Sequence, residues 1–153
     1  MRNVAKSACL LICVLTQYTY AAKTPSDAVR AYLNALMLGD TAQLARYTTG
    51  QLLKVHERLL ENPTYGQHLR DRYAGAAFEV TAGAPLGKRH GVRAKLSLAD
   101  VGEVDRIFIV EDSASGFWQI VSELDTTAFC KQREHVLCSY AASDLQAPTI
   151  QSE

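Results

Sequence analysis

Apolar residues recur every three or four positions at the start of the predicted fold. This spacing places them on one side of a helix over residues 25–38. Thr24 is a suitable N-cap, Pro25 suits the first helical position, and Asp27 completes an arrangement like a capping box. Gly39 ends this helix. Its predicted apolar face consists of Val29, Tyr32, Leu33, Leu36 and Met37.

Shorter helical segments follow, separated by residues that stop a helix. Asp40 caps the first of them, and Asn62 with Pro63 ends the second. We expect these helices at residues 40–49, 51–60 and 65–73.

After Gly75 the apolar residues alternate with polar or small ones, which is the period of a β-strand. The continuous apolar run at residues 107–110 is typical of a central strand covered on both faces. We expect strands at 78–82, 92–98, 104–110 and 117–121, a turn-rich connection at 83–91 and a hairpin loop at 113–116. Helices followed by strands predict an α+β domain, with the helices packed on one face of an antiparallel sheet.

The first 21 residues have the order of a secretory signal peptide. Arg2 and Lys6 precede a short apolar run at residues 8–15, and small residues follow near Ala21, after which we place the cleavage. The run is too short to span a bilayer, which disfavours an uncleaved anchor. Cys13 suggests a lipid-attachment site, but the residues before it are not small. We therefore expect an exported protein, periplasmic or secreted.

Cleavage would leave a single domain with a slightly acidic charge. Without Arg2 and Lys6, 14 Lys and Arg face 16 Asp and Glu, a net charge of −2. Such a chain has no basic excess for nucleic acid, and we expect a monomer or a simple dimer without a membrane span. We divide it into the signal peptide at 1–21, the domain at 22–126 and a tail at 127–153.

Two cysteines remain after cleavage, Cys130 and Cys138. In an exported protein they most simply form one disulfide, which closes the tail outside the core. His135 lies between them, and the three residues together give an alternative reading as a metal site, although a zinc site normally needs a fourth ligand. We favour the disulfide, and we predict no metal and no cofactor.

The opening residues Thr24, Pro25, Ser26 and Asp27, together with the strand Gly116 to Ile120 that contains Trp118, resemble the nuclear-transport-factor-2-like superfamily. Within it, the chain is most similar to small exported bacterial domains related to lumazine-binding-like proteins. The resemblance covers roughly residues 24–124. It implies a cone, in which a strongly bent sheet wraps a long helix and often leaves a pocket at the open end. Members include isomerases, dehydratases, ligand-binding modules and scaffolds, so the resemblance does not decide the function.

Some members of this superfamily use an acid or base in the pocket, and two residues are candidates here. His56 can exchange a proton near neutral pH, or it can be a histidine at the edge of the core. Asp105 adjoins the apolar run and can be a pocket carboxylate with a raised pKa, or it can lie on the solvent face at the start of a strand. The charged side chains between His68 and Arg72 are better explained as a solvated helix face.

Tyrosines are frequent in the helical half. Tyr32, Tyr47, Tyr65 and Tyr73 can line a cavity, or they can be core residues whose hydroxyls reach the surface. We take Tyr32, Tyr47 and Tyr73 as the candidate ligand-binding residues.

A group of basic residues on one loop and the following strand forms a possible docking face for an acidic protein, or an ordinary solvated surface: Lys88, Arg89, His90, Arg93 and Lys95. No phosphate-binding glycine loop and no nucleophile elbow occur in the sequence. The sequence therefore favours a non-enzymatic binding module for a partner protein or a small apolar ligand. The alternatives are a structural subunit of an envelope assembly, or a small lyase or isomerase with His56 or Asp105 as its base.

Overall fold

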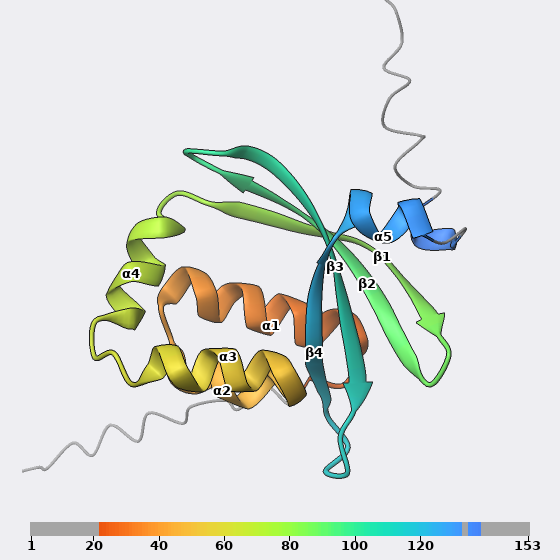
Figure 1. Cartoon of the computed structure of the whole chain (residues 1–153), viewed down its shortest axis with the longest axis horizontal. Helices are drawn as coiled ribbons and strands as arrows, with labels where there is room; N and C mark the ends of the chain where they lie inside the picture. The colour runs from red at the N-terminus through yellow and green to blue at the C-terminus, as the bar shows by residue number, and fades with distance from the viewer. Residues whose placement is uncertain (1–21, 133–134, 139–153) are drawn as a thin grey trace, which may run out of the picture.

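The computed structural model describes residues 22–132 and 135–138, so the signal peptide, its cleavage site and the end of the tail lie outside the described residues. Helices come first: α1 (Pro25–Leu38), α2 (Thr41–Tyr47), α3 (Gly50–Leu60) and α4 (Tyr65–Arg72). The strands follow, and a last helix ends this part of the chain: β1 (Ala77–Leu86), β2 (Arg89–Leu98), β3 (Gly102–Asp112), β4 (Trp118–Asp125) and α5 (Thr126–Gln132). The predicted α+β class is confirmed (Figure 1).

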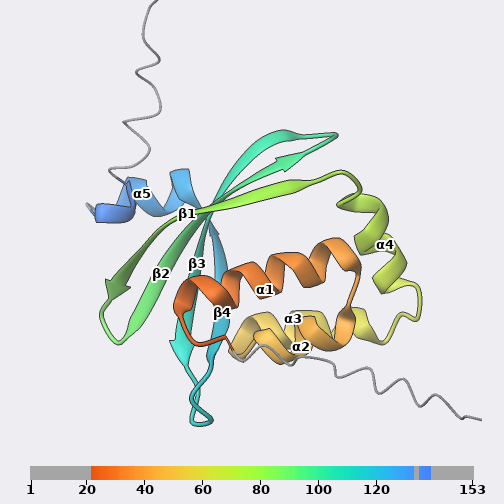
Figure 2. The same cartoon turned by 180° about the vertical axis from the view of Figure 1, so that it is seen from behind.

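The ends of α1 form as the sequence predicts. The Thr24 hydroxyl accepts a hydrogen bond from the Asp27 amide at 3.1 Å, and Pro25 occupies the first turn. Gly39 ends the helix with φ of 61°, in the left-handed region that favours glycine. Asp40 then caps α2 by accepting from the Gln43 amide at 3.0 Å. This sharp change of direction turns α2 and α3 back beneath α1 (Figure 2).

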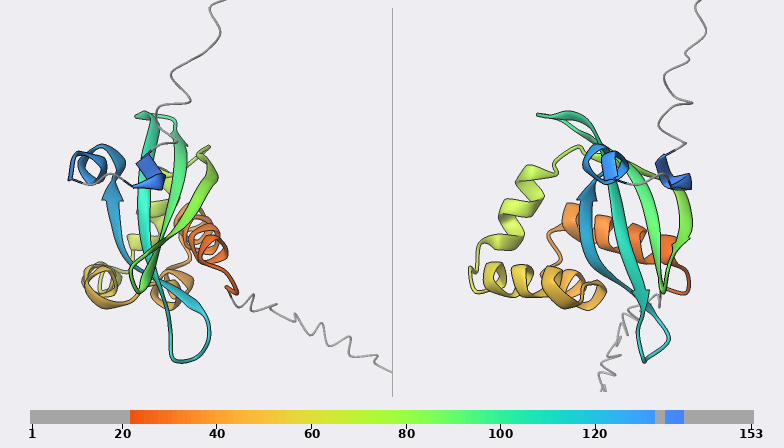
Figure 3. Two further views of the ribbon diagram at one scale, coloured as in Figure 1. Left: turned by 90° about the vertical axis from the view of Figure 1, so that its right-hand side faces the viewer. Right: turned by 45° about the vertical axis from the view of Figure 1, so that its right-hand side comes forward.

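The four described strands form one antiparallel sheet in the order β1-β2-β3-β4. One face of this sheet carries α1 and the other carries α5 (Figure 3). We call these the inner and the outer face. Among the described residues, none of the helices combines the length and the apolar character needed to cross a membrane.

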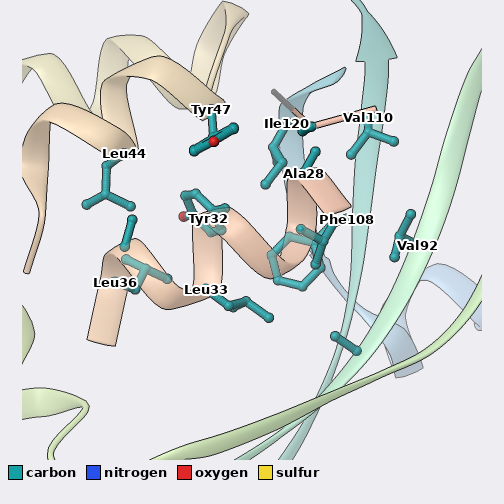
Figure 4. Packing of buried hydrophobic residues seen from close by; sticks show 14 of the residues in the cluster. Ala28, Tyr32, Leu33, Leu36, Leu44, Tyr47, Val92, Phe108, Val110 and Ile120 are labelled. Carbon is teal, nitrogen blue, oxygen red and sulfur yellow. The ribbon is translucent and has the colours of Figure 1, made fainter. Parts of the chain in front are cut away.

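The inner face holds the larger core. Phe108, Val110 and Ile120 of the sheet are fully buried against α1 and α2, where Tyr32 meets Phe108 edge to face with ring centroids 5.9 Å apart (Figure 4). The buried members that α1 and α2 contribute to this cluster are Ala28, Val29, Tyr32, Leu33, Ala35, Leu36, Leu44 and Tyr47. The predicted apolar face of α1, apart from Met37, is therefore the face that belongs to this core.

The outer face holds a second, smaller core. Ile107 and Ile109 point to this face and pack against Phe129 of α5 and against Leu137. The predicted disulfide joins Cys130 to Cys138 and so ties Leu137 to α5. Gly91 lies beneath Leu137, and a Cβ atom at Gly91 would overlap that side chain. The start of the tail is thus part of a core, and the prediction that it lies outside the core was wrong.

The prediction of a turn-rich connection at residues 83–91 was also wrong. Strands β1 and β2 are longer than the alternation of apolar and polar residues suggested. They continue to a tight turn at Gly87, whose φ is 63°. A bulge between Val80 and Ala82 breaks the alternation of β1. Pro85, which reads as a turn residue, is tolerated because β1 lies at an edge of the sheet.

Leu137→Ala tests whether the outer core stabilises the fold. Leu137 is fully buried, so removing its side chain leaves a cavity between α5 and the sheet, and we expect a loss of about 2–5 kcal/mol in the free energy of unfolding. Urea unfolding of the oxidised protein measures this loss. Val136→Ala is the matched control, because Val136 is 52% exposed and should change stability by less than about 0.5 kcal/mol. Equal stability of the two variants would contradict a second core.

Candidate binding site

A bulge in β4 decides which of its side chains face the helices. Val110 pairs with Ile120 and Ile109 pairs with Ser122, so Val121 is an extra residue without a partner in β3. Beyond the bulge Glu123 pairs with Phe108 of the inner core. Residues directly opposite one another share a face of a sheet, and Glu123 therefore points to the inner face.

Asp125 points the same way, and Arg106 connects the two carboxylates. Asp125 pairs with Arg106, which in turn pairs with the buried inner residue Ala94. The Arg106 guanidinium donates to Glu123 Oε1 at 3.2 Å and to Asp125 Oδ2 at 2.9 Å. The exposed fraction of the side chain is 30% for Arg106, 35% for Glu123 and 53% for Asp125. Arg106 thus forms ion pairs with two acidic side chains on the inner face.

These charged groups border a hollow between α3 and β4, which we call the inner hollow. Its volume is about 480 Å³, and Leu52 and Val55 of α3 form its apolar wall. Val55 is 46% exposed although it is a large apolar residue. The remaining lining comes from Gln51, Arg106 and the strand residues Val121, Ser122, Glu123, Leu124 and Asp125.

His56 of α3 forms hydrogen bonds with two tyrosines from neighbouring helices. His56 Nε2 lies 3.2 Å from the Tyr32 hydroxyl, and His56 Nδ1 lies 3.2 Å from the Tyr65 hydroxyl. Only 5% of His56 is exposed, and burial lowers its pKa below the usual 6.5. A neutral imidazole has one donor and one acceptor, so both ring nitrogens are satisfied by the two tyrosines. His56 therefore joins α1, α3 and α4 within the core.

The position of α4 depends on a close approach of two glycines. A Cβ atom at Gly39 would overlap the backbone of Gly66, and a Cβ atom at Gly66 would lie 2.7 Å from the Gly39 carbonyl oxygen. This contact holds the start of α4 against the end of α1, which brings Tyr65 within reach of His56.

Glu123 also acts on the tyrosines of the helical half. Burial raises the pKa of Tyr73, and the charge of Glu123 raises it further. The pKa of Tyr32 is raised in the same way, by burial first and by Glu123 second. Burial raises the pKa of Glu123 itself, while Arg106 opposes that shift. Tyr32, Tyr73 and Glu123 therefore form one electrostatically connected group at the inner face.

The structure brings together some of the predicted site residues and separates others. Tyr32 and Tyr47, both labelled in Figure 4, are buried in the inner core, and Tyr73 packs partly buried against that core. Asp105 lies on the outer face, where it forms an ion pair with the buried Arg93. It is therefore on the opposite side of the sheet from His56 and from the inner hollow.

The predicted basic docking face does not form a cationic surface. Arg89 pairs with Glu111 at 3.1 Å, Lys95 pairs with Glu103 at 3.5 Å, and Arg93 pairs with Asp105. The His90 ring turns to the inner face and meets the Trp118 ring, with centroids 4.9 Å apart. Carboxylates on β3 thus balance the basic residues of β2.

Sequence reasoning missed Arg106, Glu123 and Asp125. Strict alternation from Ile120 places Ser122 and Leu124 on the inner face, and the bulge at Val121 reverses that assignment. No residue type at Val121 marks the bulge in the sequence. The sequence could have placed Arg106, because Arg106 and Phe108 are two positions apart in one strand and therefore lie on the same face of β3.

No family model matches the chain, and no curated protein matches it. Within residues 22–132 and 135–138, no group of three or more His, Cys, Asp or Glu residues is arranged to hold a metal ion. The function therefore has to be inferred from the inner hollow and the side chains that line it.

The lowered pKa of His56 makes stability depend on pH in a defined direction. The unfolded chain binds a proton at His56 near pH 6.5, whereas the folded protein does so only at lower pH. We therefore expect the free energy of unfolding to fall below about pH 6.5, by up to about 1.4 kcal/mol per pH unit from this group. Glu123, with its raised pKa, changes stability in the opposite direction over part of this range.

Comparison with His56→Gln isolates the histidine, because Glu123 titrates in both proteins. Urea unfolding between pH 7 and pH 5 should show a smaller acid-induced loss for His56→Gln than for the unmodified protein. His68→Gln is the control, since His68 is exposed on α4 and its replacement should leave the pH dependence unchanged. An identical pH dependence for all three proteins would contradict the lowered pKa of His56.

Proposed function

We propose that this protein is an exported, non-enzymatic binding module that uses the inner hollow to hold a small apolar ligand or an apolar side chain of a partner protein. The observation that carries the proposal is the lining of that hollow. The exposed Val55 and the partly buried Leu52 of α3 face a charged strand across a volume of about 480 Å³, which lies within the range of ligand sites in proteins. An apolar wall with a few polar groups is the usual composition of such sites.

Two further observations support this function and compartment. The Cys130–Cys138 disulfide is typical of proteins that leave the cytoplasm. Helices packed on one face of an antiparallel sheet, with a hollow beside them, also fit the proposed relationship to the nuclear-transport-factor-2-like superfamily. Tyr32, Tyr47 and Tyr73 are not among the residues that line the inner hollow, and on this proposal they support the site from the core.

The alternative functions receive less support. A lyase or isomerase with His56 as its base would need a free ring nitrogen, and both nitrogens meet tyrosine hydroxyls. Asp105 is held by Arg93 on the outer face, away from the inner hollow. A structural subunit that used an open sheet face would find the outer face largely covered by α5 and Leu137.

Val55→Trp tests the inner hollow directly. We expect the neutral apolar fluorophore N-phenyl-1-naphthylamine to bind the unmodified protein with an increase in fluorescence. A tryptophan at Val55 fills the hollow without replacing a core residue, and it should weaken this binding by about tenfold. Val101→Trp is the matched control, because Val101 is 68% exposed outside the hollow and its replacement should leave binding unchanged. Absence of binding, or equal binding to both variants, would contradict a ligand site between α3 and β4.

A further inference from the structure

Strand β4 has a free edge along most of its length. It is the last strand in the sheet, and the described chain contacts its exposed edge near its start. The Trp118 amide donates to the Ala22 carbonyl at 3.2 Å, and Ile120 forms a bridge to Thr48 and accepts a 2.9 Å hydrogen bond from the Thr49 amide. Along residues 121–125, no other strand or bridge of the described residues pairs with this edge. In the left view of Figure 3, α5 lies at the upper end of β4 and α3 lies near its lower end.

A second hollow lies across the sheet from the first. This outer hollow has a volume of about 420 Å³ and lies between the sheet and α5. Leu86, Ile109 and Phe129 form apolar walls, and Arg89 and Asp125 are its charged lining residues. Ser122, Leu124 and Asp125 of β4 border both hollows. The free edge of β4 therefore runs between two hollows, one on each face of the sheet.

Two hollows on either side of a free edge fit one kind of occupant. Successive side chains of an extended peptide point to opposite faces, and a peptide that pairs with a sheet edge places alternate side chains on each side. We propose that residues 121–125 of β4 bind an extended peptide segment of another protein as an additional strand. One set of its side chains enters the inner hollow, and the other set enters the outer hollow. This proposal rests on the proposed function and names the partner of the same site.

The charges at the inner hollow decide the chemistry of the peptide. Among the residues that line the inner hollow, Arg106 is the one cation beside the two acids Glu123 and Asp125, so the lining carries one negative charge in excess. Arg72 acts on Glu123 from outside this lining. Asp125 is also the more exposed of the two acids. A lysine or arginine of the peptide, entering from the open edge, would pack its apolar stem on Leu52 and Val55 and balance this charge with its head. Apolar side chains of the peptide suit the outer hollow and Phe129.

The same charges disfavour two other occupants. A second copy of the chain, paired through β4, would bring the Glu123 and Asp125 carboxylates of both copies together on one face. Residues 139–153 of this chain contain Asp144 and Glu153 but no lysine or arginine. The occupant with complementary charge is therefore a basic and apolar strand from a different protein.

Fluorescence anisotropy with synthetic peptides tests the proposal on the disulfide-bonded protein. The probe is a fluorescein-labelled peptide of eight residues that alternates lysine and valine, and an alternating glutamate and valine peptide is its counterpart. We expect the lysine peptide to bind and Glu123→Lys to weaken its binding by about tenfold, while the same variant improves binding of the glutamate peptide. Glu79→Lys is the matched control, since Glu79 is exposed on the other edge strand, and it should change neither affinity by more than about twofold.

Backbone methylation separates strand pairing from simple charge attraction. In an extended peptide the amides of the lysines point to one edge and those of the valines to the other. Methylation of one set should abolish binding, while methylation of the other set should leave it intact. Equal affinities of both methylated peptides, or no effect of Glu123→Lys, would overturn strand addition.

The fluorophore N-phenyl-1-naphthylamine distinguishes this failure from a failure of the proposed function. If the fluorophore binds at the inner hollow and no peptide binds, strand addition is overturned and the binding module stands. If neither the fluorophore nor any peptide binds, both proposals fail.

Discussion

Strand β3 carries four consecutive apolar residues, and a strand sends successive side chains to opposite faces of its sheet. Phe108 and Val110 therefore need cover on one face, and Ile107 and Ile109 need cover on the other. The helices α1 and α2 supply the first cover. The second comes from α5 and Leu137, which the Cys130–Cys138 disulfide ties together, and Gly91 leaves the space that Leu137 fills. The remaining architecture follows from this need to bury both faces of one strand.

The helices leave both faces of the sheet partly uncovered at β4, and the candidate site lies there. α3 and α5 approach the last strand from opposite faces, and the two hollows remain beside its edge. The bulge at Val121 changes the polarity of this region, because it turns Glu123 and Asp125 toward the inner face, where regular alternation would have placed Ser122 and Leu124. Arg106 then holds both acids, and burial raises the pKa of Glu123. A single extra residue thus places two carboxylates on the inner face of an otherwise apolar sheet.

Much of this fold could be predicted from local sequence patterns, whereas most of the site could not. Thr24, Gly39 and Asp40 define helix ends through interactions with near neighbours, and the run at residues 107–110 predicts a strand buried on both faces. The bulges in β1 and β4 depend on the partner strand, so alternation within one strand misplaced the residues beyond them. The sequence offered His56 as a base or as a histidine at the edge of the core, but its two tyrosine partners come from helices that meet only in the folded chain. For Asp105 the sequence left open a pocket carboxylate or a place on the solvent face, and it could not show the ion pair with Arg93, which lies on a different strand.

The central claim is that Glu123 faces the inner hollow and that this hollow binds a ligand. Carbon-13 NMR of the Glu123 side-chain carboxyl, followed through a pH titration with and without N-phenyl-1-naphthylamine, measures both parts at once. The account predicts a midpoint above the usual 4.5 in the free protein, and a further rise when the bound fluorophore excludes water from the carboxylate. A midpoint at the usual value that the fluorophore does not change would contradict it.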